Sequence, residues 1–163
     1  MIIRHANEND LPAIVAIYNA SIPGRMATAD LEPVSVASRI NWFKNRTPVK
    51  HPLWVIETGE VIMGWLSFQP FYGRPAYQAT AEVSIYIATK YQKQGLGKKL
   101  LKEAIRQSPN LGLKTLIGFI FGHNEASLKL FEKFGFEHWG DMPKIADIDG
   151  LERDLIILGL RVG

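Results

Sequence analysis

The run from Val83 to Leu101, VSIYIATKYQKQGLGKKLL, constrains the fold more than any other part of the sequence. Four of its first five residues are β-branched or aromatic, which favours a strand. Its end opens a helical pattern, because apolar residues recur with helical spacing from Leu100 to Ile105. We therefore expect a helix to begin near Gly97, after a turn that holds Gly95. The chain is predicted to run here from a strand through a glycine turn into a helix.

The turn has the properties of a phosphate cradle. Gly95 and Gly97 lack the Cβ atoms that would keep a ligand away from the backbone. The first turn of a helix offers N–H groups without internal partners, and its dipole favours an anion. Glycine in such a loop also has a purely structural use. The pattern is neither a P-loop nor a full G-x-G-x-x-G fingerprint, because Leu100 stands in the third glycine's place. The phosphate would belong to another cofactor.

Two segments together resemble the signature of a known family. Gln92-x-x-Gly95-x-Gly97 is similar to the Q/R-x-x-G-x-G/A motif with which GNAT-type N-acetyltransferases bind the pyrophosphate of acetyl-CoA. The run from Asn124 to Phe136, NEASLKLFEKFGF, is similar to the family's N-x-x-(A/S)-x-x-L-(Y/H/F)-x-x-x-G-F segment. Two motifs at the family's usual separation are far more specific than either alone, and the resemblance extends over nearly the whole chain.

Composition bounds the kind of protein. A chain of 163 residues that is 47% hydrophobic is the right size for one domain, residues 1–163, with one substantial core. The chain has no cysteine, which excludes disulfides, thiolate metal sites and a cysteine nucleophile and is compatible with the cytoplasm. No stretch approaches eighteen uninterrupted apolar residues, so we expect a soluble, cytoplasmic protein without a membrane segment. The histidines show no metal-ligand spacing, and we expect no metal.

Positive charge gathers around the proposed cradle although the net charge is only +3. A solvated helix face and a positive surface beside a polyphosphate cofactor explain this cluster about equally well. No aromatic-interleaved basic stripe accompanies it, so a nucleic-acid partner is not expected. The cluster comprises Lys90, Lys93, Lys98, Lys99 and Lys102.

The order of expected elements is β-α-α-β-β-β-α-β-α-β-β, an α/β domain with a mixed sheet. Strands are expected at 2–5, 53–57, 61–68, from about 79, at 113–121, 136–139 and 154–160; helices are expected after Asn7 and Pro33, at 97–107 and after Asn124. The last two strands would pair across a variable loop, residues 141–150. The resemblance implies the GNAT-type fold, a mixed, mostly antiparallel sheet with splayed strands and flanking helices.

The resemblance also implies a site for acetyl-CoA as acyl donor. In this family the pantetheine arm inserts where the strand before the cradle splays from its neighbour, and it bonds the strand backbone as an added strand would. Some of these positions equally suit the core or a helix cap. The implied cofactor residues are Ile85, Tyr86, Ile87, Lys93, Gln94, Gly95, Leu96, Gly97, Lys98, Asn124 and Ser127.

Glu82 is the candidate general base. Acetyl transfer to an amine needs the neutral amine, whereas ammonium dominates near pH 7, so a group must accept the proton. A lone carboxylate in the apolar setting Ala81-Glu82-Val83 would have a raised pKa, which suits a base. The alternative is an exposed strand carboxylate. Many relatives carry a tyrosine where this chain has Phe131, which cannot protonate the leaving thiolate. Another group, such as His123 or Tyr86, or water would then serve as donor, or the thiolate would leave unassisted.

The acceptor is inferred from a narrower resemblance, to phosphinothricin and methionine sulfoximine N-acetyltransferases. It rests on Ile17-Tyr18-Asn19, on the run from Asp30 to Ser35, and on Arg74-Pro75-Ala76-Tyr77. It implies a small amino-acid-like amine as substrate, with Arg74 gripping a carboxylate and Tyr77 lining the pocket. Both residues would otherwise be ordinary loop-surface residues. The resemblance further implies a homodimer with the acceptor site near its interface.

Two alternatives stay open. The sequence departs from the narrower family after Gly140, which leaves a protein amine or a polyamine open as the acceptor. The phenylalanine at position 131 also leaves room for a CoA-binding regulatory module that no longer catalyses transfer. An acceptor screen that follows thiol release would separate the three hypotheses.

Overall fold

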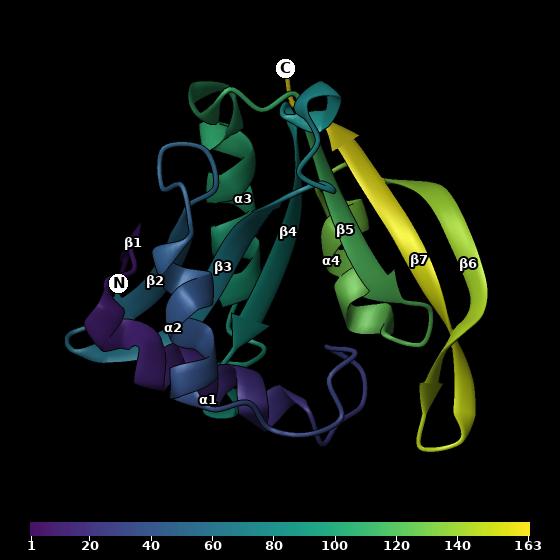
Figure 1. Cartoon of the computed structure of the whole chain (residues 1–163), viewed down its shortest axis with the longest axis horizontal. Coiled ribbons are helices and arrows are strands. Elements are labelled where there is room, and N and C mark those ends of the chain that lie inside the picture. Colours follow the sequence, from purple (N-terminus) through teal and green to yellow (C-terminus); the bar gives the residue numbers. More distant parts are fainter.

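A computed structural model of the protein describes all 163 residues and shows one seven-stranded sheet with helices on both faces (Figure 1). The strand order is β1-β2-β3-β4-β5-β7-β6, and every neighbouring pair is antiparallel except β4 and β5. The expected order of elements and the mixed, mostly antiparallel sheet are confirmed. The strands are β1 Ile2–His5, β2 Leu53–Thr58, β3 Val61–Pro70, β4 Thr80–Ile87, β5 Thr115–Phe121, β6 Glu137–Ile148 and β7 Leu151–Arg161.

Four α-helices and four short 3₁₀ helices connect the strands. The α-helices are α1 Leu11–Ser21, α2 Val36–Lys44, α3 Leu96–Gln107 and α4 Glu125–Lys133. The 3₁₀ helices are η1 Glu8–Asp10, η2 Pro75–Tyr77, η3 Thr89–Tyr91 and η4 Ser108–Leu111. None of the helices has the length and apolar character needed to cross a bilayer.

The central strands are buried on both faces, which is why they are almost continuously apolar. Successive side chains of a strand point to opposite faces. In β3, Leu66 and Phe68 pack in a large core with Leu100 of α3 and Phe131 of α4, whereas Trp65 packs with residues of α1 and β2 in a smaller core. Helices α3 and α4 therefore cover one face of the sheet, and α1 and α2 cover the other (Figure 1).

Local polar contacts fix where the first helices begin. Asn7 and Asp10 form a reciprocal capping box, but they cap η1, and α1 follows from Leu11. The sequence pattern predicted one helix here and missed the tighter first turn. Arg4 donates to the carboxylates of both Asp10 and Glu57, at 2.8 to 3.1 Å, and so ties the start of α1 to β1 and β2.

The expected loop at 141–150 is wrong. β6 and β7 form one long hairpin that continues through this segment and ends in a tight turn at Asp149 and Gly150, whose φ values are +55° and +83°. Two positive φ angles suit the hairpin turn that matches strand twist. Irregular register near 138–140 and 142–146 interrupts the alternation of side chains, and this hid the strand from pattern analysis. The hairpin extends beyond the rest of the sheet (Figure 1).

Candidate functional site

The sheet opens between its two parallel strands. β4 and β5 are paired only where Thr80–Glu82 lie opposite Thr115–Ile117. β4 stays paired with β3 as far as Ile87, and β5 stays paired with β7 as far as Phe121. The edge of β4 that faces β5 therefore has no strand partner beyond Glu82. The expected splay is present, and an extended ligand can pair with such an edge.

A groove of about 520 Å³ occupies this opening. One wall is β4, and the other comes from β5, the start of α4 and the β6–β7 hairpin. Four of the eleven sequence-predicted cofactor residues line the groove, namely Ile85, Tyr86, Asn124 and Ser127. Ile87 and the six turn residues from Lys93 to Lys98 do not line it. Ile87 is the last residue of β4, and the six turn residues follow it in the chain, up to the first turn of α3.

The turn before α3 presents an uncapped helix start. Gly95 is the N-cap residue with φ +79°, and no side chain accepts from the first amides of α3. A Cβ at Gly95 would meet nothing within 4 Å, so glycine is needed there for its backbone angle. A Cβ at Gly97 would lie 3.2 Å from Leu130 of α4, so this glycine permits close helix packing. These are structural reasons for the two glycines, and the expectation that they make room for a ligand stays a prediction beside them.

Positive charge is crowded at this helix start. Lys98 is exposed, and its side-chain contact with Lys133 and the repulsion between the two ammonium groups lower the pKa of Lys98. Two like charges held together favour a bound anion, which would relieve the repulsion. The amides of the first turn and these two lysines together could hold a phosphate group.

A loop between α1 and α2 crosses the mouth of the groove. The ring of His123 donates from Nε2 to the carbonyl of Arg25 at 2.9 Å, and Asn124 donates from Nδ2 to the carbonyl of Met26 at 3.3 Å. From the opposite wall, the hydroxyl of Tyr86 donates to the carbonyl of Ala27 at 3.3 Å. Both walls therefore hold the loop, and the donors of His123 and Tyr86 are already engaged by its carbonyls.

Asn124 has two structural partners. Its Oδ1 accepts from the amide of Ser127 at 3.3 Å and so caps α4, while its Nδ2 makes the contact to the crossing loop. The cap expected from the sequence is confirmed. One side chain therefore joins the start of α4 to the loop over the groove.

Glu82 is half-buried on β4 and lines two cavities. Loss of water around its carboxylate raises its pKa, and a hydrogen bond from the hydroxyl of Ser84, at 3.4 Å, opposes the rise. It forms no salt bridge within 4.0 Å. The raised pKa expected from the apolar setting is therefore present, and the alternative of a fully exposed strand carboxylate is wrong.

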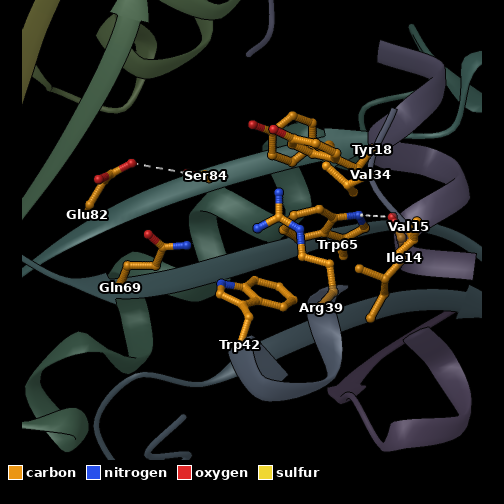
Figure 2. A pocket seen from close by; sticks show the side chains of 11 residues that line it. Ile14, Val15, Tyr18, Val34, Arg39, Trp42, Trp65, Gln69, Glu82 and Ser84 are labelled. Carbon is orange, nitrogen blue, oxygen red and sulfur yellow. Dashed lines mark hydrogen bonds between the residues drawn. The ribbon is translucent and has the colours of Figure 1, made fainter. Parts of the chain in front are cut away.

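The second cavity, of about 170 Å³, lies between the sheet and helices α1 and α2 (Figure 2). We call it the aromatic cavity. Its lining is Ile14, Val15, Tyr18, Val34, Arg39, Trp42, Trp65, Gln69, Glu82, Ser84 and Tyr86. The ring of Trp65 lies 4.7 Å from that of Tyr86 and 6.0 Å from that of Trp42, and its Nε1 donates to the carbonyl of Ile14 at 3.1 Å. The hydrogen bond and the ring contacts fix this wall.

Sequence reasoning missed most of this cavity, although one signal for it exists. In the β3–β4 register Trp65 lies opposite Tyr86, and Gln69 lies opposite Glu82. Paired residues share a face of the sheet. Alternate positions of the two strands therefore supply one aromatic and polar surface. The pattern was readable in each strand, but only the register and the covering helices place Arg39 and Trp42 against it.

Arg74 and Tyr77 are not brought to either cavity. Both are exposed in the segment around η2, and Arg74 makes no side-chain hydrogen bond or salt bridge. Tyr77 packs its ring 5.5 Å from that of Phe71, in a group of rings outside the lining of both cavities. Within one chain, the two predicted acceptor residues lie apart from Glu82. No group of three or more His, Cys, Asp or Glu side chains is arranged to hold a metal ion.

Comparison with known proteins agrees with this geometry. Residues 13–136 match the Acetyltransferase (GNAT) family. The acetyltransferase YwnH of Bacillus subtilis is 54% identical over 161 residues, 98% of each chain. The L-methionine sulfoximine/L-methionine sulfone acetyltransferase of Pseudomonas aeruginosa is 34% identical over 165 residues, 98% of this chain and 94% of its own. The structure of a GNAT superfamily phosphinothricin acetyltransferase from Sinorhizobium meliloti, in complex with AcCoA, has a TM-score of 0.93 at 29% identity, over 99% of this chain and 88% of that one.

Proposed function

The chain belongs to the GNAT family of acetyltransferases, and from this membership we propose that it transfers acetyl from acetyl-CoA to the primary amine of a small amino-acid-like acceptor. Relatives named for methionine sulfoximine, methionine sulfone and phosphinothricin support this acceptor class. The observation that carries the proposal is that Glu82 lines both the groove and the aromatic cavity. One carboxylate thus stands where a donor in the first cavity would meet an acceptor in the second.

The groove suits acetyl-CoA as donor. When bound, acetyl-CoA supplies the acetyl thioester. The unpaired edge of β4 at Ile85 and Tyr86 offers backbone groups to an extended arm with amide groups, and the turn from Lys93 to Lys98 offers uncapped amides to a pyrophosphate. Asn124 and Ser127 face the same groove from α4. We assign these residues to donor binding.

The aromatic cavity suits a small acceptor. Its volume of about 170 Å³ compares with roughly 30 Å³ for one water in the liquid, so it has room for a molecule of amino-acid size. A protein segment or a long polyamine would have to lie mostly outside it. We therefore place the acceptor here and prefer a small amine over the larger acceptors that the sequence left open.

Glu82 is proposed as the general base. The acceptor arrives mainly as ammonium, and Glu82 takes its proton, directly or through a water. The freed nitrogen forms a bond to the acetyl carbonyl carbon while the bond from that carbon to sulfur breaks, and CoA leaves as a thiolate. Burial brings the pKa of Glu82 nearer to the working pH, which improves a base. Phe131 has no proton to give, and the donors of His123 and Tyr86 are engaged, so we assign protonation of the thiolate to water.

An acceptor panel followed by thiol release tests the proposal. We expect turnover with amino-acid analogues to exceed that with polyamines and peptide amines. Glu82→Gln should lower kcat by about 10²- to 10⁴-fold near neutral pH. It should also abolish the fall in kcat/KM that the wild type shows as pH drops through the raised pKa of Glu82.

Glu60→Gln, in the exposed turn between β2 and β3, is the matched control and should change neither quantity. An unchanged rate and pH profile in the Glu82 variant would remove this residue from the role of base. Acetyl-CoA binding without thiol release for any amine would favour the regulatory module instead.

Assembly and location belong to the same proposal. We infer a homodimer from the family resemblance and a cytoplasmic location from the cysteine-free composition. Sedimentation analysis of the purified chain and fractionation of the source cells would check the two statements. A monomer in sedimentation, or activity in a membrane or external fraction, would contradict them.

A further inference from the structure

Arg39 points into the aromatic cavity from helix α2 (Figure 2). Its guanidinium carbon lies 5.3 Å from the ring centroid of Tyr18 and 5.8 Å from that of Trp42. Contacts with two aromatic faces hold a guanidinium in one orientation and leave its N–H edge free to bind a partner. The side chain is therefore oriented in advance of any ligand.

Most hydrogen-bond donors of Arg39 have no partner. A guanidinium carries five N–H donors, and Arg39 makes a single contact, from Nη2 to Asp30 at 3.4 Å. The structural arginine Arg4 is better satisfied. It makes four hydrogen bonds to two carboxylates, whereas Arg39 has one contact with one carboxylate. Arg39 thus differs from Arg4, which ties the start of α1 to β1 and β2.

The guanidinium of Arg39 and the proposed base Glu82 line the same aromatic cavity. Glu82 and Gln69 lie on adjacent strands at one part of the lining, and Arg39 approaches from the helix that covers the sheet. Arg39 forms one ion pair, with Asp30, and its remaining N–H groups have no protein partner. A guanidinium with unpaired N–H groups can bind a carboxylate through two parallel hydrogen bonds. The surrounding rings of Trp42 and Trp65 suit an apolar or sulfur-bearing side chain. Cation, base and aromatic wall together match the groups of an amino acid.

We propose that Arg39 determines acceptor specificity by binding the acceptor's carboxylate in the aromatic cavity. This proposal rests on the proposed function and deepens it. It assigns to Arg39 the contact that the sequence resemblance attached to Arg74, which is exposed and lies outside the cavity. An amine that lacks the carboxylate would leave the Arg39 donors unpaired and would bind more weakly.

The test compares two acceptors that differ only in this group, L-methionine sulfone and the amine that remains after its carboxylate is removed. Arg39→Met should raise KM for the amino acid about 10- to 100-fold, the range expected for one hydrogen-bonded charge pair. It should change kcat/KM for the decarboxylated amine no more than about twofold. Arg39→Lys should retain part of the preference, because lysine keeps the charge but loses the planar fork.

Arg74→Met is the matched comparison. We expect it to leave the preference for the carboxylate intact. An equal loss of kcat/KM for both acceptors in Arg39→Met, or a selective loss in Arg74→Met, would overturn the assignment. An unchanged KM for acetyl-CoA in the Arg39 variants confirms that the fold and the groove are preserved.

Acceptor binding is also measured without turnover. Trp42 and Trp65 line the aromatic cavity, so titration of tryptophan fluorescence with L-methionine sulfone follows occupancy directly. Weaker binding by Arg39→Met than by the wild type supports the assignment even where no thiol is released, in which case only the proposed function fails. Equal binding by both proteins refutes the assignment even where transfer proceeds.

Discussion

Replacing Gly118 by alanine tests how the floor of the groove is packed. Gly118 follows the last residue of β5 that pairs with β4, so it lies where the two strands begin to diverge. A Cβ at this position would lie 2.8 Å from Cε2 of Phe131, whereas real Cβ atoms essentially never come under 3.0 Å of a neighbour. Phe131 is 4% exposed and packs edge to face with Phe136 at 4.9 Å. Its ring therefore packs in the core and also lines the groove.

The expected cost follows from this contact. Overpacking of a well-filled core costs about 1–3 kcal/mol. The change from glycine to alanine recovers about 0.4–1 kcal/mol by reducing the freedom of the unfolded chain. We expect the Gly118 variant to lose about 1–2 kcal/mol of unfolding free energy, which corresponds to a drop in Tm of about 2–8 °C for a chain of this size. Because Phe131 lines the groove, KM for acetyl-CoA should rise as well.

Urea denaturation and steady-state kinetics measure the two effects. Gly122→Ala serves as the control for stability, because a Cβ there would meet its nearest neighbour at an ordinary 3.5 Å. In a Phe131→Leu background, where the ring is gone, the Gly118 substitution should cost much less. A Gly118 variant as stable as the wild type, or the same loss in both backgrounds, would refute the packing argument.

Two further predictions concern the site. The pKa of Glu82 is raised from its ordinary value of 4.5 in the folded state. Between the ordinary and the raised pKa the folded state therefore binds more protons than the unfolded state, and wild-type stability falls as pH rises through this range. Glu82→Gln should gain stability relative to the wild type from pH 4 to pH 8 in urea denaturation, and a constant difference would contradict the burial argument. Asn124→Ala should lose about 0.5–2 kcal/mol of unfolding free energy through the missing cap and should raise KM for acetyl-CoA. Asn124→Ser should keep the cap and lose only the contact to the loop at Met26. Equal stability of the two variants would count against a capping role.

Local pattern was enough for the fold class and for the elements that form the proposed donor site. The strand, turn and helix around Gly95, and the cap at Asn124, depend on interactions between residues close in sequence, which periodicity and residue preference report directly. Backbone groups form most of the proposed donor site, so its position follows once the strand and the helix are placed. The raised pKa of Glu82 also followed from its immediate apolar neighbours.

Only the tertiary structure decided what lines the cavity in which we place the acceptor. The aromatic cavity combines α1, α2, β3 and β4, whose relation depends on strand register and on helices packed across a sheet, and sequence spacing reports neither. For this reason the sequence interpretation named Arg74 for the carboxylate contact that we propose for Arg39, which lines the cavity. The pairing of the last two strands was expected, but the continuation of the β6–β7 hairpin through residues 141–150 was missed for a related reason. The backbone bonds there pass through irregular segments whose side chains do not alternate. Interactions between residues close in sequence can be predicted from the sequence itself, whereas contacts between distant elements depend on how those elements pack.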